Sequence, residues 1–125
     1  DPLVALQAQA EAYIRFGVEH PEHYRVAFMD RTGFTPDQYL QEMIAEGTAF
    51  SRAVETLEAL IATGRVRESL LVDGALGLAL QLWAQVHGLT SLLIAKSAAP
   101  WPPLDRIIAV QADLLVAGLL CPAPT

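Results

Sequence analysis

The sequence predicts an all-α domain. Apolar residues recur at intervals of three and four along most of the 125 residues, and no useful length alternates with the period of two that a half-buried strand requires. Prolines and glycines interrupt this periodicity and divide the chain into five expected helices. With 53% hydrophobic and 18% charged residues, the chain can form one hydrophobic core, and we expect a partner to cover part of its remaining apolar surface.

The first two helices are expected on either side of a proline. Tyr13 and Gly17 belong to the apolar face of a helix that begins near the N-terminus. Pro21 ends this helix and can occupy the first turn of the next, where its missing N–H has no helical partner to lose. The second helix is short and carries Tyr24 and Phe28 on one side, because they are four residues apart.

A single long third helix is predicted from Thr35 to about Thr63. Thr35, followed three residues later by Gln38, has the pattern of a capping box, and Gly64 is a suitable C-terminal cap. The apolar stripe of this helix is expected to contain Tyr39, Met43, Gly47, Phe50, Val54, Leu57 and Ile61.

The fourth helix, predicted from about Ser69 to Ala98, contains 22 consecutive residues, 74–95, without a charged side chain. Such a segment is long enough to cross a bilayer. Against that, Gln81, Gln85 and His87 would lie at mid-depth, and neither flank carries clustered Lys or Arg. A helix that is apolar on two opposed faces is instead expected to lie between two neighbours, its own core and a second copy of the protein.

The last helix is predicted from Leu104 to about Leu120, after a proline-rich break. In the helix before it, Gly74, Gly77 and Gly88 each lower helix propensity by about 1 kcal/mol relative to alanine, which indicates close approach of another backbone. These two helices from each of two copies would form a four-helix dimer interface that buries more than roughly 1,200 Å². The candidate interface residues are Leu78, Leu82, Gln85, Leu89, Leu93, Leu104, Ile108, Gln111, Leu115 and Leu119.

Charge and cysteine content restrict the environment and the partners. The net charge of −6 repels phosphate, so this part of the protein is not expected to bind nucleic acid by itself. Cys121 is the only cysteine, which excludes an internal disulfide and favours a reducing, cytoplasmic location. No signal peptide precedes the first helix, and because helical periodicity starts directly at Asp1-Pro2, we expect the chain to be part of a longer protein.

Patterns for catalysis and for metal binding are not found in the sequence. His20 and His23 have no Cys or His-Glu-x-x-His partner, and Pro21 between them interrupts the helix, so a solvated turn is the preferred interpretation. No nucleophile has a paired base, and no phosphate-binding loop is present, so neither an enzyme nor a cofactor is expected. A metal- or haem-binding bundle centred on His87 or His20 remains as an alternative.

Aromatic residues on the inward stripes of several helices indicate a small-molecule pocket. Bulky rings, with Gly17 and Gly47 leaving gaps between them and a few polar groups at the edge, describe an apolar cavity for an apolar or aromatic ligand. For any single aromatic residue taken alone, ordinary core packing is the preferred interpretation. The candidate pocket residues are Tyr13, Gly17, Tyr24, Phe28, Met43, Phe50, Leu80, Trp83, His87 and Ser91.

Three short motifs resemble the C-terminal domain of one group of TetR-like transcriptional regulators. The group's Trp-x-x-x-His-Gly signature is similar to residues 83–88, its His-Pro-x-x-Tyr segment to residues 20–24, and its turn before the long apolar helix to residues 64–67. The motifs occur in the same order as in that group, and the resemblance extends over essentially the whole chain.

The resemblance implies a homodimeric regulator in which this C-terminal domain binds a small effector. DNA would be contacted only by an N-terminal helix-turn-helix domain of roughly fifty residues, three helices long, which this chain does not contain. Residues 1–125 would then be the ligand-binding and dimerisation domain of a cytoplasmic regulator, with no membrane contact. A helical dimerisation module without any ligand is the alternative from a different class.

Overall fold

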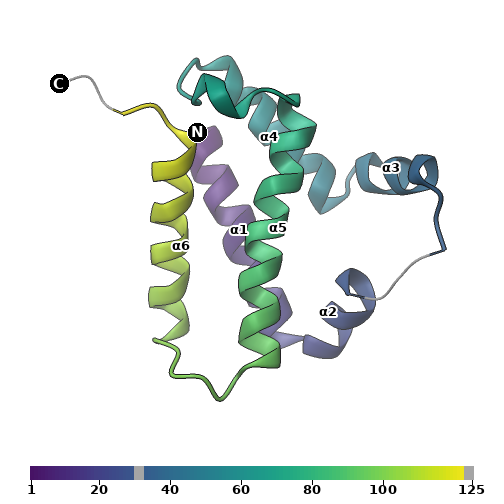
Figure 1. Ribbon diagram of the computed structural model, residues 1–125, viewed down its shortest axis with the longest axis vertical. Helices are drawn as coiled ribbons and strands as arrows, with labels where there is room; N and C mark the ends of the chain where they lie inside the picture. Colours follow the sequence, from purple (N-terminus) through teal and green to yellow (C-terminus); the bar gives the residue numbers. More distant parts are fainter. Residues whose placement is uncertain (30–32, 123–125) are drawn as a thin grey trace.

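The computed structural model describes residues 1–29 and 33–122, and within these ranges the chain is helical, as predicted (Figure 1). The elements are α1 (Pro2–Glu19), α2 (Pro21–Phe28), α3 (Pro36–Ile44), α4 (Ala49–Ala62), a 3-10 turn η1 (Glu68–Leu70), α5 (Gly74–Ala95) and α6 (Leu104–Leu119). Extended pairing in the described residues is limited to an isolated antiparallel bridge between Val66 and Leu120. The all-α prediction is confirmed.

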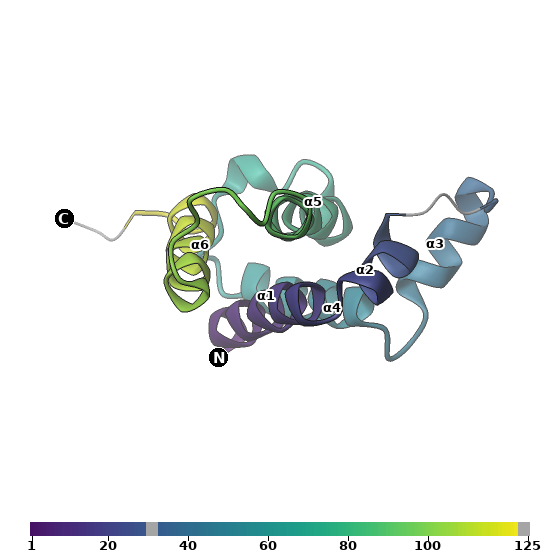
Figure 2. The same ribbon diagram turned by 90° about the horizontal axis from the view of Figure 1, so that it is seen from below.

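The helices form a layered bundle with one projecting arm. Seen from below, α1 and α4 lie side by side, α5 lies opposite them, and α6 closes one edge beside α1 (Figure 2). α2 continues beyond the end of α1, whereas α3 projects from the bundle and contacts α4 (Figure 1). Because α5 packs on both α1 and α4, its inner surface is shared between two neighbours.

The predicted break at Pro21 is confirmed. α1 ends at His20, whose φ of −131° and ψ of 62° are not helical, and Pro21 opens α2. At the other end of α1, the side chain of Asp1 accepts a hydrogen bond of 2.9 Å from the Leu3 amide. The chain therefore changes direction at His20, between α1 and α2, and Tyr24 on α2 is buried in the bundle.

The prediction of one helix from Thr35 to Thr63 is wrong, because two helices occupy this segment. The capping box at Thr35 is formed, but α3 stops at Ile44. Gly47 has a φ of +84°, a left-handed conformation that glycine adopts without steric cost. Thr48 then caps α4 through a bond of 3.1 Å from the Ser51 amide. Residues 1–29 and 33–122 therefore contain six α-helices, one more than the five expected.

The uncharged helix begins later than predicted. The chain passes through η1 after residue 67, and α5 starts only at Gly74, whose φ is +68°. α5 ends at Ala95 instead of Ala98, and α6 ends one residue before the expected Leu120. Apolar residues continue through residues 70–72, but the backbone of Glu68–Leu70 forms a 3-10 turn, which is tighter than an α-helix.

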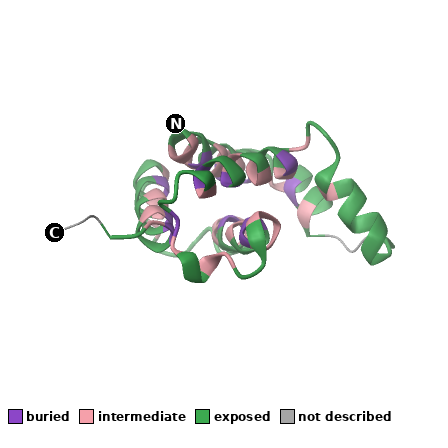
Figure 3. Cartoon of the chain, turned by 90° about the horizontal axis from the view of Figure 1, so that it is seen from above, coloured by how far each residue is buried: buried purple, intermediate pink, exposed green. Residues whose placement is uncertain are grey.

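Two clusters of buried residues form the core, and α1 contributes to both. The first contains Leu6, Leu57 and Leu60 on α1 and α4, together with Leu78 on α5. The second contains Ile14, Val86 and Ile108 on α1, α5 and α6. Buried positions gather on the facing sides of these helices, whereas α3 is exposed almost throughout (Figure 3).

α5 is long and apolar enough to cross a membrane by length and composition alone, and one of its sides packs on α1 and α4. Leu78, Ala79, Val86 and Thr90 are buried against α1 and α4. The opposite side, here named the outer face of α5, is exposed. The outer face consists of Gln81, Ala84, Gln85, Gly88, Leu92 and Ala95.

Candidate functional site

Rings from four helices converge at the end of the bundle where α2 joins α1. This aromatic cluster consists of Tyr13, Tyr24, Phe28, Phe50, Trp83 and His87. The ring centroids of Tyr13 and Phe28 are 5.1 Å apart, and the imidazole of His87 stacks on Tyr24 at 5.5 Å. Six of the predicted pocket residues are therefore brought together in space.

The polar atoms of the cluster form one continuous chain of hydrogen bonds. The Trp83 indole N–H donates to the Tyr13 hydroxyl oxygen at 3.0 Å, and the two tyrosine oxygens are 2.9 Å apart. The Tyr24 oxygen is 2.6 Å from Nδ1 of His87, whose Nε2 is 3.3 Å from the Ser91 oxygen. Ser91, a seventh predicted residue, thus ends the chain.

The donor and acceptor roles of the side chains limit the direction of these hydrogen bonds. An indole nitrogen can only donate, so Tyr13 accepts from Trp83 and can pass its own proton to Tyr24. Tyr24 can in turn donate to Nδ1 of His87, and Nε2 of the same ring then faces Ser91. Both ring nitrogens of His87 are engaged by side chains of the network.

Burial keeps both tyrosines protonated. Removal from water raises the pKa of Tyr13, and the hydrogen bond to Tyr24 raises it further. Burial also raises the pKa of Tyr24, which has no exposed surface. At neutral pH the two phenols therefore remain hydrogen-bond donors.

Gly17 is also at this site, but the expectation that it leaves a gap is wrong. A Cβ atom there would collide with Cγ2 of Thr90 and lie 3.0 Å from Cδ2 of Tyr24. Gly17 is buried, so the missing side chain is what allows α1 to approach α5 closely. Gly47 is exposed in the turn between α3 and α4 and lines neither of the two grooves described below.

The remaining predicted pocket residues lie outside the cluster. Met43 is half-buried on α3, and Leu80 on α5 is 40% exposed. Sequence reasoning missed Gln9, one turn before Tyr13 on α1, whose amide nitrogen donates to the Thr56 hydroxyl at 2.9 Å. The four-residue spacing from Tyr13 was a signal that could have identified it.

Two open grooves flank α6, and no residue of the aromatic cluster lines either of them. One, of about 420 Å³, lies between α5 and α6 and includes Gln81, Gln85 and Leu114. The other, of about 620 Å³, lies between α1 and α6 and includes Arg15 and Asp105.

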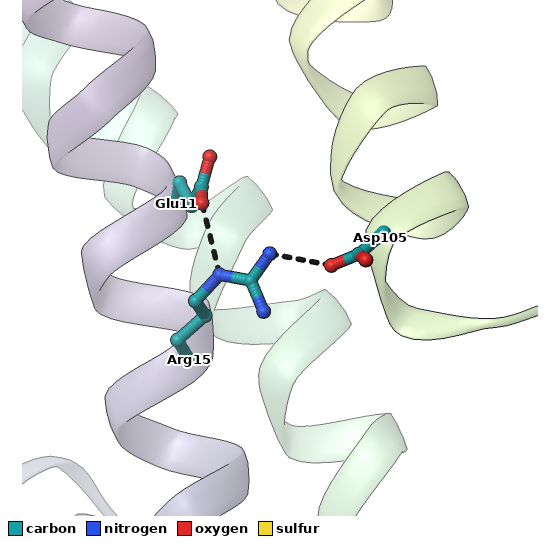
Figure 4. Close-up of polar contacts among 3 residues, drawn as sticks. All are labelled: Glu11, Arg15 and Asp105. Atoms are coloured by element: carbon teal, nitrogen blue, oxygen red, sulfur yellow. Dashed lines mark hydrogen bonds and ion pairs between the residues drawn. The ribbon is translucent and has the colours of Figure 1, made fainter.

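A charged contact fixes the start of α6 against α1 (Figure 4). Arg15 donates from Nε to Glu11 at 2.9 Å and from Nη2 to Asp105 at 2.6 Å. The other end of α6 is held by the backbone, since the amide of Arg67 donates to the Leu119 carbonyl at 2.8 Å. Because Asp105 is largely exposed, water screens the ion pair, which positions α6 more than it stabilises the fold.

The structure places the predicted interface residues largely inside the chain. Leu78, Ile108, Leu115 and Leu119 are buried, and Gln85 is exposed. The other five, Leu82, Leu89, Leu93, Leu104 and Gln111, are half-buried. On α5, the small residues Ala84, Gly88 and Ala95 face outward, because α5 packs on α1 and α4 through the leucine-rich sides of the helix.

The described residues form an all-helical domain with a polar network where α1, α2 and α5 meet. No group of three or more His, Cys, Asp or Glu side chains that could hold a metal ion is found in the described ranges. Residues 6–117 match the family described as Tetracyclin repressor-like, C-terminal domain, and the chain belongs to that family. Such domains are parts of regulatory, non-enzymatic proteins. Neither a curated protein nor a solved structure matches the chain.

Proposed function

We propose that this chain is the effector-sensing and homodimerisation domain of a TetR-like transcriptional regulator, acting in the cytoplasm without membrane contact. A small apolar or aromatic effector would modulate DNA binding by an N-terminal helix-turn-helix domain. One observation carries the proposal beyond the family match: α5 contributes Trp83 and His87 to the aromatic cluster on one side and bears the exposed outer face on the other. The same rigid helix would thus belong to both sites. The closer resemblance to the Trp-x-x-x-His-Gly group is part of this proposal.

The exposed glycines support a second copy as the partner of α5 and α6. A Cβ atom at Gly88 or Gly118 would meet nothing within 4 Å, so packing within one chain does not require glycine there. Each lowers helix propensity by about 1 kcal/mol relative to alanine. Close approach of a second copy's helices would explain both, and would cover Leu92, Val110 and Leu114, which are at least half exposed.

The proposed interface therefore differs from the one expected from the sequence. It centres on the outer face of α5 and on the exposed side of α6, with the half-buried leucines at its margin. The buried residues Leu78, Ile108, Leu115 and Leu119 would support it from within the core. Four helices would meet, two from each copy, as in the predicted bundle.

Effector binding would act through the relative positions of α1, α2 and α5. The hydrogen-bond chain joins Tyr13 on α1 and Tyr24 on α2 to His87 on α5. A ligand that enters among these rings must favour one arrangement of the three helices over another, since equal affinity for both would produce no switch. The resulting shift of α1 and α2 against the dimer core would change the spacing of two DNA-binding domains.

Sedimentation equilibrium tests the dimer with a matched pair of variants. Leu114→Glu introduces a charge at a side chain that is 63% exposed on α6, and Val26→Glu does so at one that is 71% exposed on α2. Wild-type and Val26→Glu should be dimers, and Leu114→Glu should be a monomer with unchanged helix content. A wild-type chain that stays monomeric at tens of micromolar would refute the proposal.

A dimerisation module without a ligand is the second candidate, favoured by the polar network, which is complete without any further molecule. Native mass spectrometry of gently purified protein separates the two functions, because a co-purifying small molecule supports the sensor. Metal or haem binding at His87 is disfavoured, because Tyr24 and Ser91 engage both of its ring nitrogens. Metal analysis and a visible absorbance spectrum test that alternative for His20 as well.

A further inference from the structure

Two glutamines are the polar residues of the outer face of α5. Gln81 and Gln85 are exposed and four residues apart, so they are neighbours on the same side of the helix. The other four residues of this face are alanine, glycine or leucine. Both glutamines also line the groove between α5 and α6, together with the buried residues Leu78, Leu115 and Leu119.

Charge makes this face suitable for contact with a second copy. Each copy has a net charge of −6, so surfaces that carry its acidic side chains repel one another. α5 has no charged residue, and Leu114, which lines the same groove from α6, is 63% exposed. A second copy can therefore pack on this helix and cover apolar surface of α6 without burying a charge of α5.

Contact with a second copy would remove the two side-chain amides from water. A buried polar group requires a hydrogen-bond partner, and leaving it unpaired is costly. The side chains of alanine, glycine and leucine, which form the rest of the outer face, offer no such partner. An amide has both a donor and an acceptor, so two facing glutamines satisfy each other with two hydrogen bonds.

Twofold symmetry restricts how the glutamines can meet. In a symmetric contact, if residue i of one copy touches residue j of the other, then j of the first copy also touches i of the second. When two α5 helices run antiparallel and cross at the level of residue 83, Gln81 lies opposite the partner's Gln85, and Gln85 lies opposite the partner's Gln81. Every other antiparallel crossing brings at most one glutamine against its own counterpart, so this register alone pairs all four amides.

The antiparallel direction is supported by the shape of α5 and by its dipole. In this register, Leu92, which is 50% exposed, comes to lie beside the partner's Gly74. A Cβ atom at Gly74 would meet nothing within 4 Å, so space for a leucine side chain is available there. Antiparallel helices also place opposite ends of their dipoles together, whereas parallel helices place like ends together.

We propose that Gln81 and Gln85 form reciprocal amide–amide hydrogen bonds between two copies and thereby fix the register of the two α5 helices. This inference rests on the proposed dimer and adds to it the residues that select its geometry. A polar pair within an apolar interface specifies one register at some cost in stability, whereas apolar side chains alone permit several.

Mixing two charge variants tests the pairing, with sedimentation equilibrium as the measurement. Gln81→Lys and Gln85→Glu should each dimerise at least about tenfold more weakly than wild-type protein, because each homodimer buries charges without a counter-charge. An equimolar mixture of the two should recover a dimer within about threefold of the wild-type affinity, since the new lysine then meets the new glutamate and the two remaining glutamines meet each other. A mixture of Gln81→Lys with Gln81→Glu is the matched control and should remain as weak as its components.

Recovery in the control mixture would show that residue 81 faces residue 81 and would overturn the pairing. A first mixture that stays monomeric, or single variants that dimerise like wild-type protein, would also overturn it. Both positions are exposed in one chain, so the helix content of every variant should be unchanged. A wild-type chain that stays monomeric contradicts the regulator proposal itself, whereas a wild-type dimer without recovery in the first mixture contradicts the register alone.

Discussion

Replacing Gly17 by alanine tests a close contact between α1 and α5. The new methyl group would collide with Cγ2 of Thr90 and press on the ring of Tyr24, and both of these residues are fully buried. Thr90 cannot easily turn away, because its hydroxyl donates to the Val86 carbonyl at 2.7 Å and its branched side chain has few rotamers in a helix. α1 and α5 must therefore separate.

The expected loss combines two opposed terms. Overpacking a core costs about 1–3 kcal/mol, and the short contact with Thr90 places this site near the upper end. Alanine in place of glycine within a helix returns about 1 kcal/mol. The net destabilisation should be about 1–2 kcal/mol, measured as the free energy of unfolding in urea. For a domain of this size, the thermal midpoint should fall by roughly 3–10 °C.

A double-mutant cycle identifies the cause. Thr90→Ser removes the colliding Cγ2 and keeps the hydroxyl that bonds to Val86. The Gly17→Ala change should therefore cost less by about 1 kcal/mol in the Thr90→Ser background than in wild-type protein. If Gly17→Ala leaves stability unchanged in both backgrounds, the packing of α1 on α5 described above is incorrect.

Three further perturbations address the same helices. Trp83→Ala should lower the free energy of unfolding by about 3 kcal/mol, the low end for a tryptophan, because this one is half-buried; unchanged chemical denaturation would contradict its place in the cluster. Because burial raises the pKa of Tyr24, the unfolded state loses that proton first, and stability should fall as pH rises above about 10, with up to roughly 1.4 kcal/mol per pH unit for each such tyrosine. Tyr24→Phe should flatten this slope, and a slope equal to wild-type would count against it. Gly88→Leu has open space in one chain, so it should weaken only the dimer, seen as a sedimentation constant that falls on dilution while helix content persists.

Helix ends could be predicted where side chains mark them and not elsewhere. Thr35 and Gln38 predict a capping box, and the capping box is formed. The turn at Gly47 was missed because this glycine falls in register with the apolar stripe on both sides. Thr48, followed three residues later by Ser51, is a second capping signal. It ends the helical periodicity because the Thr48 side chain accepts a hydrogen bond from the Ser51 amide, and the left-handed Gly47 before it lets the chain turn there.

The orientation of α5 could not be predicted from residue types. Charged residues normally mark the solvent side of a helix, and α5 has none. Its sequence therefore does not indicate which of its two leucine-rich sides faces outward. Packing against α1 and α4 decides it by turning Gly88 outward. The convergence of Tyr13, Tyr24 and Trp83 followed from their stripes, but the hydrogen bond from Gln9 to Thr56 depends on how α1 packs on α4, which residue types along one helix do not determine.

These orientations suggest how the two halves of the proposed function could be coupled. His87 and Gly88 are consecutive on α5, one bonded inward to Tyr24 and the other at the centre of the outer face. α6, the second helix of the proposed interface, is tied to α1 by Arg15 and Asp105 rather than to α5 by extensive packing. A ligand that displaces α1 against α5 would consequently displace α6 as well, and the two interface helices would change their relative position. The groove between α5 and α6 is the space in which that movement can occur. The contact of Gly17 with Thr90, the hydrogen bond from Trp83 to Tyr13 and the shared cluster of Ile14 and Val86 all join α1 to α5 and would carry that displacement.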